Sequence, residues 1–323
     1  MSILITGGAG FIGSHFAELI STETDDTCVC LDNFNDFYDP ALKRSNAAQL
    51  EKLDRVKVIE GDFCDLESNR QLLQEQQITR IVHLGAYAGV RYSVENPFIY
   101  ERVNVGGTLA LLEAAREFPV DRFLLVSSST VYGKGAGIPF REDQPLGIPA
   151  SPYGSSKRSA ELMGLTYQQL HNVPVVCLRP FSVYGPRLRP DLALTVFTDA
   201  IANGRKFPLF GDGSIRRDFT HVSDICRGLF NALHAAGIDG EVFNLGHSEP
   251  IEIRRIIELI EKSLGKTAQI DQQPERPEDL PITYADLTRA EKHLQYAPQV
   301  PIEAGIDEFC KWFREWHEVH PVK

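Results

Sequence analysis

The sequence predicts a doubly wound parallel α/β sheet followed by a smaller C-terminal α/β domain. Short apolar runs alternate with helical patterns over the first part of the chain, and polar residues do not interrupt these runs regularly. Strands have this pattern when helices cover both faces of a parallel sheet. The first apolar run leads directly into a glycine-rich turn and a helix. After Arg179 the elements become shorter and proline and glycine more frequent, which predicts a second, smaller domain.

The first part of the chain carries strands and helices in strict alternation. Strands are expected at Ile3–Thr6, Thr27–Leu31, Val56–Glu60, Arg80–Leu84, Arg122–Ser127 and Val173–Arg179. Helices are expected at Phe11–Ser21, Asn46–Leu53, Ser68–Gln76, Pro97–Phe118 and Ser155–His171. This order is typical of a Rossmann-type sheet.

The second part is expected to return once to that sheet. A helix at Ile225–Ala235 precedes a strand at Val242–Leu245, and further helices are expected at Ile253–Leu264 and Ile302–His317. We therefore predict a first domain of residues 1–179 with 218–246. Residues 180–217 with 247–323 would form the second domain.

The composition is that of an ordinary globular protein and excludes several functions. The chain has 323 residues, of which 43% are hydrophobic and 24% charged, and a formal net charge of −11. It contains no long run of lysine and arginine, so we expect no nucleic-acid partner. No apolar stretch approaches the ~20 residues that cross a bilayer, and no secretory signal precedes the first strand. We therefore expect no membrane association.

Cysteine and histidine spacing predicts neither a disulfide framework nor a metal centre. The six cysteines form no C-x-x-C pair, which favours reduced thiols and a cytoplasmic location. The nine histidines form no H-E-x-x-H motif, and the pair His317 and His320 has a different spacing. We expect no bound metal.

The N-terminal turn predicts a nucleotide site. Gly7, Gly10 and Gly13 follow the first strand with the spacing G-x-x-G-x-x-G. Glycine lets the backbone approach a pyrophosphate, and a helix N-terminus offers free N–H groups. Asp32 ends the second strand, where a carboxylate would bind the adenosine ribose and repel a 2′-phosphate. Since no arginine or lysine follows before Lys43, we expect NAD rather than NADP.

Asp62 follows the third predicted strand, and two interpretations of it stay open. From this position the carboxylate could reach the adenine amino group of a bound nucleotide. An aspartate here is equally consistent with an ordinary loop.

Tyr153 and Lys157 predict a general base. Their spacing of four residues places both side chains on one face of a helix. A nearby ammonium stabilises a phenolate, so we expect the pKa of Tyr153 to fall from about 10 towards neutrality. Such a phenolate can take a proton from an alcohol. The hydroxyl run at residues 127–130 follows the fifth strand and could bind the reacting oxygen, although each motif alone also occurs on ordinary helices and loops.

Together these motifs resemble the extended branch of the short-chain dehydrogenase/reductase family. The matching positions are residues 6–13, 32–33, 61–62, 83–86, 104, the serine run before residues 131–133, the pair Tyr153 and Lys157, and residues 178–180. The resemblance spans almost the whole chain. It implies a nucleotide-sugar enzyme that holds NAD and uses Ser128, Tyr153 and Lys157 in catalysis.

The resemblance also implies which residues bind each ligand. For NAD these are Gly7, Gly10, Phe11, Ile12, Gly13, Asp32, Asn33, Asp62, Phe63, Leu84, Ala86, Asn104, Tyr153, Lys157 and Pro180. For the substrate they are Arg91, Ser128, Thr130, Ser182, Arg189, Arg217 and Arg276.

The residues after Ser128 distinguish the branches of this family. Nucleotide-sugar dehydratases usually carry an Asp–Glu pair there, and UDP-glucuronate decarboxylases resemble them in carrying a Glu. This chain has Ser129 and Thr130 instead, which fits a 4-epimerase that needs only one base and a returning hydride. Residues 32–39, 88–97 and 183–193 resemble the UDP-glucuronate 4-epimerases in particular.

The resemblance therefore implies a C4 epimerisation that interconverts UDP-glucuronate and UDP-galacturonate. UDP-glucose 4-epimerases usually have Asn where this chain has Ser182, and a hydroxyl there with a cation at Arg189 would suit a carboxylate. Arg189 could instead form a surface salt bridge. Arg217 and Arg276 match phosphate-contacting arginines, whose guanidinium forks suit a diphosphate.

Other functions compete with this one. The chain could be a 4-epimerase of UDP-glucose or UDP-N-acetylglucosamine. A decarboxylase is a less favoured alternative. An inactive NAD-sensing regulator would have a broken Tyr-x-x-x-Lys pair, whereas Tyr153 and Lys157 are intact. The family usually forms homodimers through two helices, which here correspond to Pro97–Phe118 and Ser155–His171.

Overall fold

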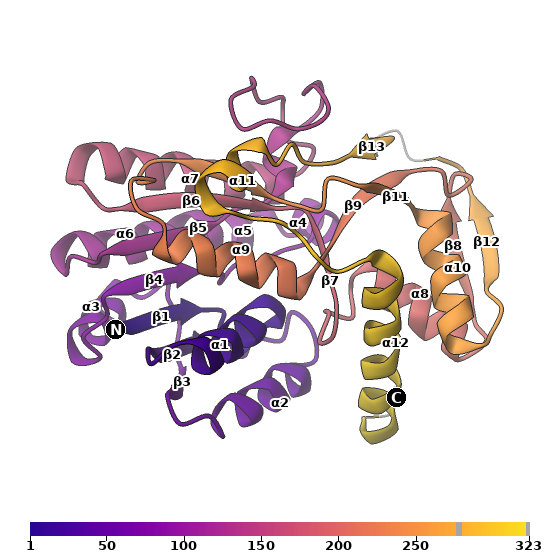
Figure 1. Cartoon of the computed structure of the whole chain (residues 1–323), viewed down its shortest axis with the longest axis horizontal. Helices are drawn as coiled ribbons and strands as arrows, with labels where there is room; N and C mark the ends of the chain where they lie inside the picture. Colours follow the sequence, from indigo (N-terminus) through magenta and orange to yellow (C-terminus); the bar gives the residue numbers. More distant parts are fainter. Residues whose placement is uncertain (276–279, 321–323) are drawn as a thin grey trace.

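Seven parallel strands form the sheet that carries the site. The computed structural model describes residues 1–275 and 280–320. The strands are β1 (Ser2–Thr6), β2 (Thr27–Asp32), β3 (Val56–Glu60), β4 (Arg80–His83), β5 (Arg122–Val126), β6 (Val175–Pro180) and β10 (Val242–Leu245). They stand in the order β10-β6-β5-β4-β1-β2-β3 (Figure 1). The strand order reverses between β1 and β4, and a crevice forms at the carboxyl ends of strands at such a reversal.

Helices cover both faces of this sheet, so the predicted fold class is confirmed. One face packs against α1 (Phe11–Glu23), α2 (Pro40–Leu50) and α9 (Val222–His234), the other against α3 (Leu66–Glu75), α6 (Thr108–Glu117) and α7 (Pro152–His171). Successive residues of β1 point to opposite faces. Ile3 and Ile5 share a core with Phe16 of α1, whereas Leu4 shares one with Leu111 of α6.

The C-terminal half adds two smaller sheets. In one, β9 (Arg216–His221) pairs with β7 (Ser182–Tyr184), β11 (Pro250–Glu252) and β13 (Ile282–Thr283); in the other, β8 (Lys206–Phe210) pairs with β12 (Gln269–Gln273). The helices of this half are α8 (Ala193–Ala202), α10 (Ile253–Leu264), α11 (Thr288–Leu294) and α12 (Ile302–Val319). Figure 1 shows β8, β12, α8 and α10 grouped at one end of the molecule.

A buried carboxylate fastens β9 to the end of β10. Asp218 accepts hydrogen bonds from the backbone nitrogens of His247 (2.6 Å), Ser248 (3.1 Å) and Ala285 (2.9 Å). These donors satisfy a charge that would otherwise be costly to bury. The smaller sheet is therefore held against the larger one at the edge where the site lies.

The helices α2 and α7 begin earlier than their sequence patterns suggested. α2 starts before the predicted Asn46, because the Asp39 side chain accepts a hydrogen bond from the Ala41 nitrogen (2.9 Å) and caps the helix. α7 starts at Pro152, where the Ser151 side chain caps it. Capping residues with an oxygen at this position favour a helix start.

The long helix predicted over Pro97–Phe118 is divided. It consists of α5 (Pro97–Tyr100), a π-helical segment (Glu101–Gly107) and α6, and α4 (Val90–Glu95) precedes it. Single π-helical turns occur frequently at functional sites. Here the segment carries Asn104, one of the residues expected to serve the cofactor site.

The chain returns to the large sheet where the sequence predicted. β10 pairs with β6 in parallel, and α9 packs against α1. The division into residues 1–179 with 218–246 and residues 180–217 with 247–323 stays a prediction. Within residues 1–275 and 280–320, no helix is both long and apolar enough to cross a membrane.

Candidate active site

The glycine turn after β1 has the shape of a phosphate cradle. Gly7 has a φ of +67°, which favours glycine. A Cβ on Gly13 would lie 2.3 Å from the Gly7 carbonyl oxygen, so a side chain there would collide with the backbone of the turn. No side chain caps the N-terminus of α1 at Gly10, so the first N–H groups of the helix are available to an anion.

Asp32 lies buried at the end of β2, beside this turn. Its Oδ1 accepts a hydrogen bond from the Phe34 nitrogen (2.9 Å). The Lys43 Nζ lies 3.7 Å from the same oxygen and donates a hydrogen bond to Asn35 (3.1 Å). The expectation of NAD rested on the absence of arginine and lysine between Asp32 and Lys43. The early start of α2 brings Lys43 into the site.

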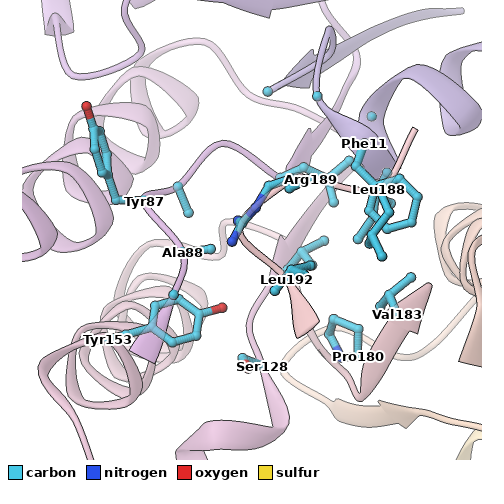
Figure 2. A pocket seen from close by; sticks show the side chains of 18 of the residues that line it. Phe11, Tyr87, Ala88, Ser128, Tyr153, Pro180, Val183, Leu188, Arg189 and Leu192 are labelled. Atoms are coloured by element: carbon cyan, nitrogen blue, oxygen red, sulfur yellow. The ribbon is translucent and has the colours of Figure 1, made fainter. Parts of the chain in front are cut away.

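One cavity joins the residues predicted for the cofactor with those predicted for the substrate. Its volume is about 570 Å³, and residues at the carboxyl ends of several strands of the large sheet line it (Figure 2). The predicted residues that line it are Gly7, Gly10, Phe11, Ile12, Gly13, Asp32, Asn33, Phe63, Leu84, Ala86, Ser128, Thr130, Tyr153, Lys157, Pro180, Ser182, Arg189 and Arg217. Lining residues that the sequence analysis missed include Phe37, Tyr38, Lys43 and Leu192.

Three of the remaining predicted residues lie elsewhere or outside the described part. Asp62 accepts a hydrogen bond from the Cys64 nitrogen (2.9 Å), as a loop aspartate does, and its contact with adenine stays a prediction. Arg91 of α4 lies over the ring of Phe210, with 5.7 Å between guanidinium and centroid. Arg276 lies outside the described residues.

Asn104 does not line the cavity but contacts a residue that does. Its side chain binds both the backbone nitrogen (2.8 Å) and the carbonyl oxygen (2.9 Å) of Tyr87. It also donates a hydrogen bond to Ser156 (2.9 Å), whose hydroxyl in turn donates to the carbonyl oxygen of Tyr153 (2.8 Å). Asn104 therefore fixes the first turn of α7 against the segment after β4.

The predicted catalytic residues meet at one wall of the cavity. Tyr153 and Lys157 come from α7, and Ser128 follows β5. The Ser128 Oγ accepts a hydrogen bond from the Thr130 hydroxyl (3.0 Å). Figure 2 shows the Tyr153 hydroxyl directed into the cavity, with Ser128 near it and Arg189 approaching from another side.

The ionisation of Tyr153 differs from the sequence prediction. Burial raises the pKa of Tyr153, while a hydrogen bond with Ser128 and the charge of Arg189 lower it. The expectation that Lys157 lowers the pKa of Tyr153 is therefore wrong. Burial also lowers the pKa of Lys157 to about 8, against an opposing effect of Glu161. Both shifts have the same cause, because burial disfavours the charged form of each group.

Arg189 is an internal cation rather than only a surface one. Its Nε and Nη2 donate to the two carboxylate oxygens of Asp191 (3.0 and 2.8 Å). The guanidinium also lies 5.3 Å from the ring centroid of Phe37. Ser182 begins β7 and lines the same cavity. The salt bridge and the cavity position, which the sequence analysis treated as alternatives, therefore occur together.

Arg217 reaches the cavity from β9. Its Nη1 donates hydrogen bonds to the carbonyl oxygens of Arg216 (2.9 Å) and Leu280 (2.7 Å). These contacts fix the guanidinium at the cavity wall. Among the described residues, no group of histidine, cysteine, aspartate and glutamate side chains could hold a metal ion.

The chain matches the family model for GDP-mannose 4,6 dehydratase over residues 4–309. It belongs to this family. The match covers the end of β1, the glycine turn, the helix α7 that carries Tyr153 and Lys157, and most of the C-terminal half. The GDP-mannose 4,6 dehydratase family is part of the extended short-chain dehydrogenases/reductases, which agrees with the resemblance found in the sequence.

Three relatives of this family are similar to the chain over nearly their whole length. The UDP-glucuronate 4-epimerase of Thermodesulfobacterium geofontis (strain OPF15) is 37% identical over 97% of this chain and 96% of that protein. The crystal structure of UDP-glucuronic acid 4-epimerase from Bacillus cereus, in complex with UDP-glucuronic acid and NAD, is 36% identical with a TM-score of 0.92, and covers 98% of this chain and 100% of that chain. The UDP-glucose 4-epimerase of Thermotoga maritima with UDP-glucose is 28% identical with a TM-score of 0.89, and covers 98% and 99%.

Proposed function

We propose that this chain is an NAD-dependent 4-epimerase that interconverts UDP-glucuronate and UDP-galacturonate. The observation that carries the proposal is a single cavity in which the Tyr153 hydroxyl and the Arg189 cation share one space with the glycine turn. The similarity to a UDP-glucuronate 4-epimerase, and to a solved one that holds UDP-glucuronic acid and NAD, supports it.

The residues of the cofactor end fit NAD. The uncapped N-terminus of α1 offers N–H groups to a pyrophosphate, and the glycines carry no side chain that would keep the backbone away from it. Asp32 offers a carboxylate to the ribose hydroxyls. When bound, NAD accepts a hydride from C4 of the sugar and later returns it.

Tyr153 is the proposed base. As a phenolate it takes the proton of the sugar 4-hydroxyl while C4 is oxidised, and it gives the proton back when the 4-keto sugar is reduced. The Ser128 hydroxyl holds the reacting oxygen, and the Lys157 ammonium stabilises the phenolate. Reduction on the opposite face of the keto sugar inverts C4.

The arginines of the C-terminal half are proposed to anchor the nucleotide while the keto sugar turns. Arg217 lies at the cavity wall, and Arg276 is assigned the same task from the sequence resemblance. A guanidinium suits phosphate oxygens because it presents several donors in one plane. Arg91 and Thr130 are proposed as further substrate contacts.

Ser182 and Arg189 are proposed to hold the sugar carboxylate. Oxidation at C4 makes the uronic acid a β-keto acid, which loses CO₂ when its carboxylate bond aligns with the carbonyl π system. Asp191 occupies Nε and Nη2 of Arg189, which leaves Nη1 for a ligand. A carboxylate held by Nη1 and the Ser182 hydroxyl would be kept away from that alignment.

The substitution Tyr153→Phe tests the proposal. It removes the base and keeps the ring, so epimerisation should fall by about 10²–10⁴-fold while UDP-glucuronate still binds. Product analysis after incubation with UDP-glucuronate, together with calorimetric binding, measures both. Tyr87→Phe is the matched control, since Figure 2 shows the Tyr87 hydroxyl pointing away from Tyr153. Undiminished turnover by Tyr153→Phe would exclude Tyr153 as the base.

A neutral substrate such as UDP-glucose is the second candidate. The observation that favours it is the Asp191 carboxylate, which already pairs with Arg189 and offsets its charge. Dehydration of the sugar is disfavoured because, within the part of the chain that the structure describes, the substrate end of the cavity offers no carboxylate to eliminate water. Among the described residues that line the cavity, Asp32 is the only carboxylate, and it belongs to the cofactor end.

We further infer a homodimer and a cytoplasmic location. The family resemblance assigns the dimer contact to the helices over residues 97–118 and 155–171. All six cysteines are free thiols, which is the usual state in a reducing compartment.

A further inference from the structure

Arg179 lies in the sequence motif 178–180 and has no role in the mechanism above. It forms a buried ion pair behind the cavity wall that carries Ser128, Tyr153 and Lys157. Its Nε and Nη2 donate to the two carboxylate oxygens of Glu161, both at 2.8 Å. Arg179 is 4% exposed and Glu161 is 3% exposed. The pair joins β6 to α7, the helix that carries Tyr153 and Lys157.

Glu161 stands one helical turn after Lys157 on α7, so the two side chains share a face. Lys157 is itself buried, at 5% exposed. Its other titratable neighbours are Cys177 of β6 and His83 of β4. Burial raises the pKa of Cys177 and lowers that of His83 to about 3, so both are neutral near pH 7. Glu161, with its partner Arg179, therefore supplies the charge beside Lys157.

The position of Arg179 is determined by a second set of contacts. Its guanidinium lies 4.8 Å from the ring centroid of Tyr132, and the Tyr132 hydroxyl donates a hydrogen bond to Asn244 (2.7 Å). The Arg179 Nη1 is buried without a hydrogen-bond partner in the described part of the chain. Buried ion pairs often stabilise a fold no better than apolar residues of similar volume. Stability alone therefore gives little reason for this pair.

We propose that Glu161 is a positioning residue that stabilises the charged form of the buried Lys157 ammonium, and that Arg179 fixes the Glu161 carboxylate in turn. The inference rests on the proposed function, because the charge of Lys157 matters only if it stabilises the Tyr153 phenolate. Its basis is geometric, because Glu161 follows Lys157 by four residues on one buried face of α7 and Arg179 holds both of its carboxylate oxygens in place. Burial lowers the pKa of Lys157, and the Glu161 carboxylate opposes this shift. Without Glu161, Lys157 would lose its proton at a lower pH.

The pH dependence of kcat tests this inference. In the unaltered protein the alkaline limb should follow the loss of the Lys157 proton. In Glu161→Gln the pKa of Lys157 falls further, so the alkaline limb should move to lower pH by about one unit. Activity at the alkaline end should then drop roughly tenfold relative to the unaltered protein, while activity at lower pH changes little.

Glu161→Gln also leaves the Arg179 charge buried without a partner, which can prevent folding. The double variant Glu161→Gln/Arg179→Gln removes both charges, and its alkaline limb should still move to lower pH, but by less than in Glu161→Gln because loss of the Arg179 cation acts in the opposite direction. Arg179→Lys retains a cation beside Glu161 and should keep the limb in place. The matched control is Asp239→Asn, which breaks the ion pair of Asp239 with Arg122 at the amino end of β5. It should leave the limb unmoved.

The outcomes are distinct for the two proposals. A double variant that folds and binds NAD, but keeps its alkaline limb at the pH of the unaltered protein, would overturn the role of Glu161. An equal loss of activity at every pH would also overturn it, because that is what a structural role produces. A failure of the proposed function would appear earlier, as an unaltered chain that does not epimerise UDP-glucuronate.

Discussion

Arg189 shows how a single side chain can connect two parts of the site. Asp191 fixes its guanidinium by two hydrogen bonds, and the Phe37 ring lies against it. The remaining donors face the cavity that contains Tyr153. An arginine whose orientation is fixed in advance loses little entropy when it binds a carboxylate. The same pairing offsets part of the Arg189 charge and so weakens its attraction for an acidic sugar.

Replacement of Arg189 or Ser182 separates an acidic from a neutral substrate. Hydrogen bonds to a charged group contribute about 1.5–3 kcal/mol. Arg189→Ala or Ser182→Ala should therefore lower kcat/KM for UDP-glucuronate by about 10–100-fold, and that for UDP-glucose much less. Steady-state rates with the two sugars measure the difference. Arg205→Ala, at an exposed ion pair with Asp199, is the control. Equal losses for both sugars would favour the neutral substrate.

Some features of individual residues could not be predicted from local sequence. The i, i+4 spacing of Tyr153 and Lys157 placed them on one helix face, and the structure has them at one cavity wall. The direction of the Tyr153 pKa shift was wrong, because burial depends on the residues that pack around the wall. Lys43 was missed for a related reason, since only the complete fold brings it beside Asp32.

At the scale of elements, the turn between β1 and α1 has almost no spare space. The Gly7 carbonyl oxygen occupies the place that a Cβ on Gly13 would take. Gly13→Ala should therefore displace the turn and weaken NAD binding by at least about tenfold, with a modest loss of stability. Titration with NAD, followed by protein fluorescence, measures this affinity. Gly137→Ala is the control, because a Cβ there meets only the end of the Gln144 side chain, at 3.7 Å. Unchanged NAD affinity in Gly13→Ala would contradict the role assigned to the turn.

Sequence patterns predicted the buried strands well and the strands around the substrate poorly. β1, β5 and β6 are largely apolar, because helices cover both their faces. β9 contains two arginines, Asp218 and His221, and has no such pattern. Its polar residues serve the cavity and bind backbone groups from distant parts of the chain. Such a strand is stabilised by pairing with residues far away in the sequence, and a local sequence pattern does not predict this pairing.

At the scale of the whole molecule, large apolar side chains remain exposed on the elements expected to form the dimer contact. Leu162 and Leu170 of α7 are 60% and 67% exposed, and Phe98 of α5 is 87% exposed. Figure 1 shows α7 beside α6, and the two helices pack together. Isolated apolar residues on a surface are normal, but several on neighbouring helices mark an interaction site.

If the proposed homodimer forms through this surface, charged substitutions there should convert it to a monomer. Burying each leucine contributes about 1.5–3 kcal/mol, so Leu162→Lys with Leu170→Lys should dissociate the dimer at micromolar concentration. Light scattering after gel filtration measures the mass. Ile148→Lys, at an 82% exposed position on a loop, should leave the mass unchanged. Because α7 also carries Tyr153 and Lys157, the monomer should melt at a lower temperature and lose activity as α7 becomes less firmly held. An unaltered chain that runs as a monomer would exclude this arrangement, and the catalytic wall would then depend on contacts within one chain alone.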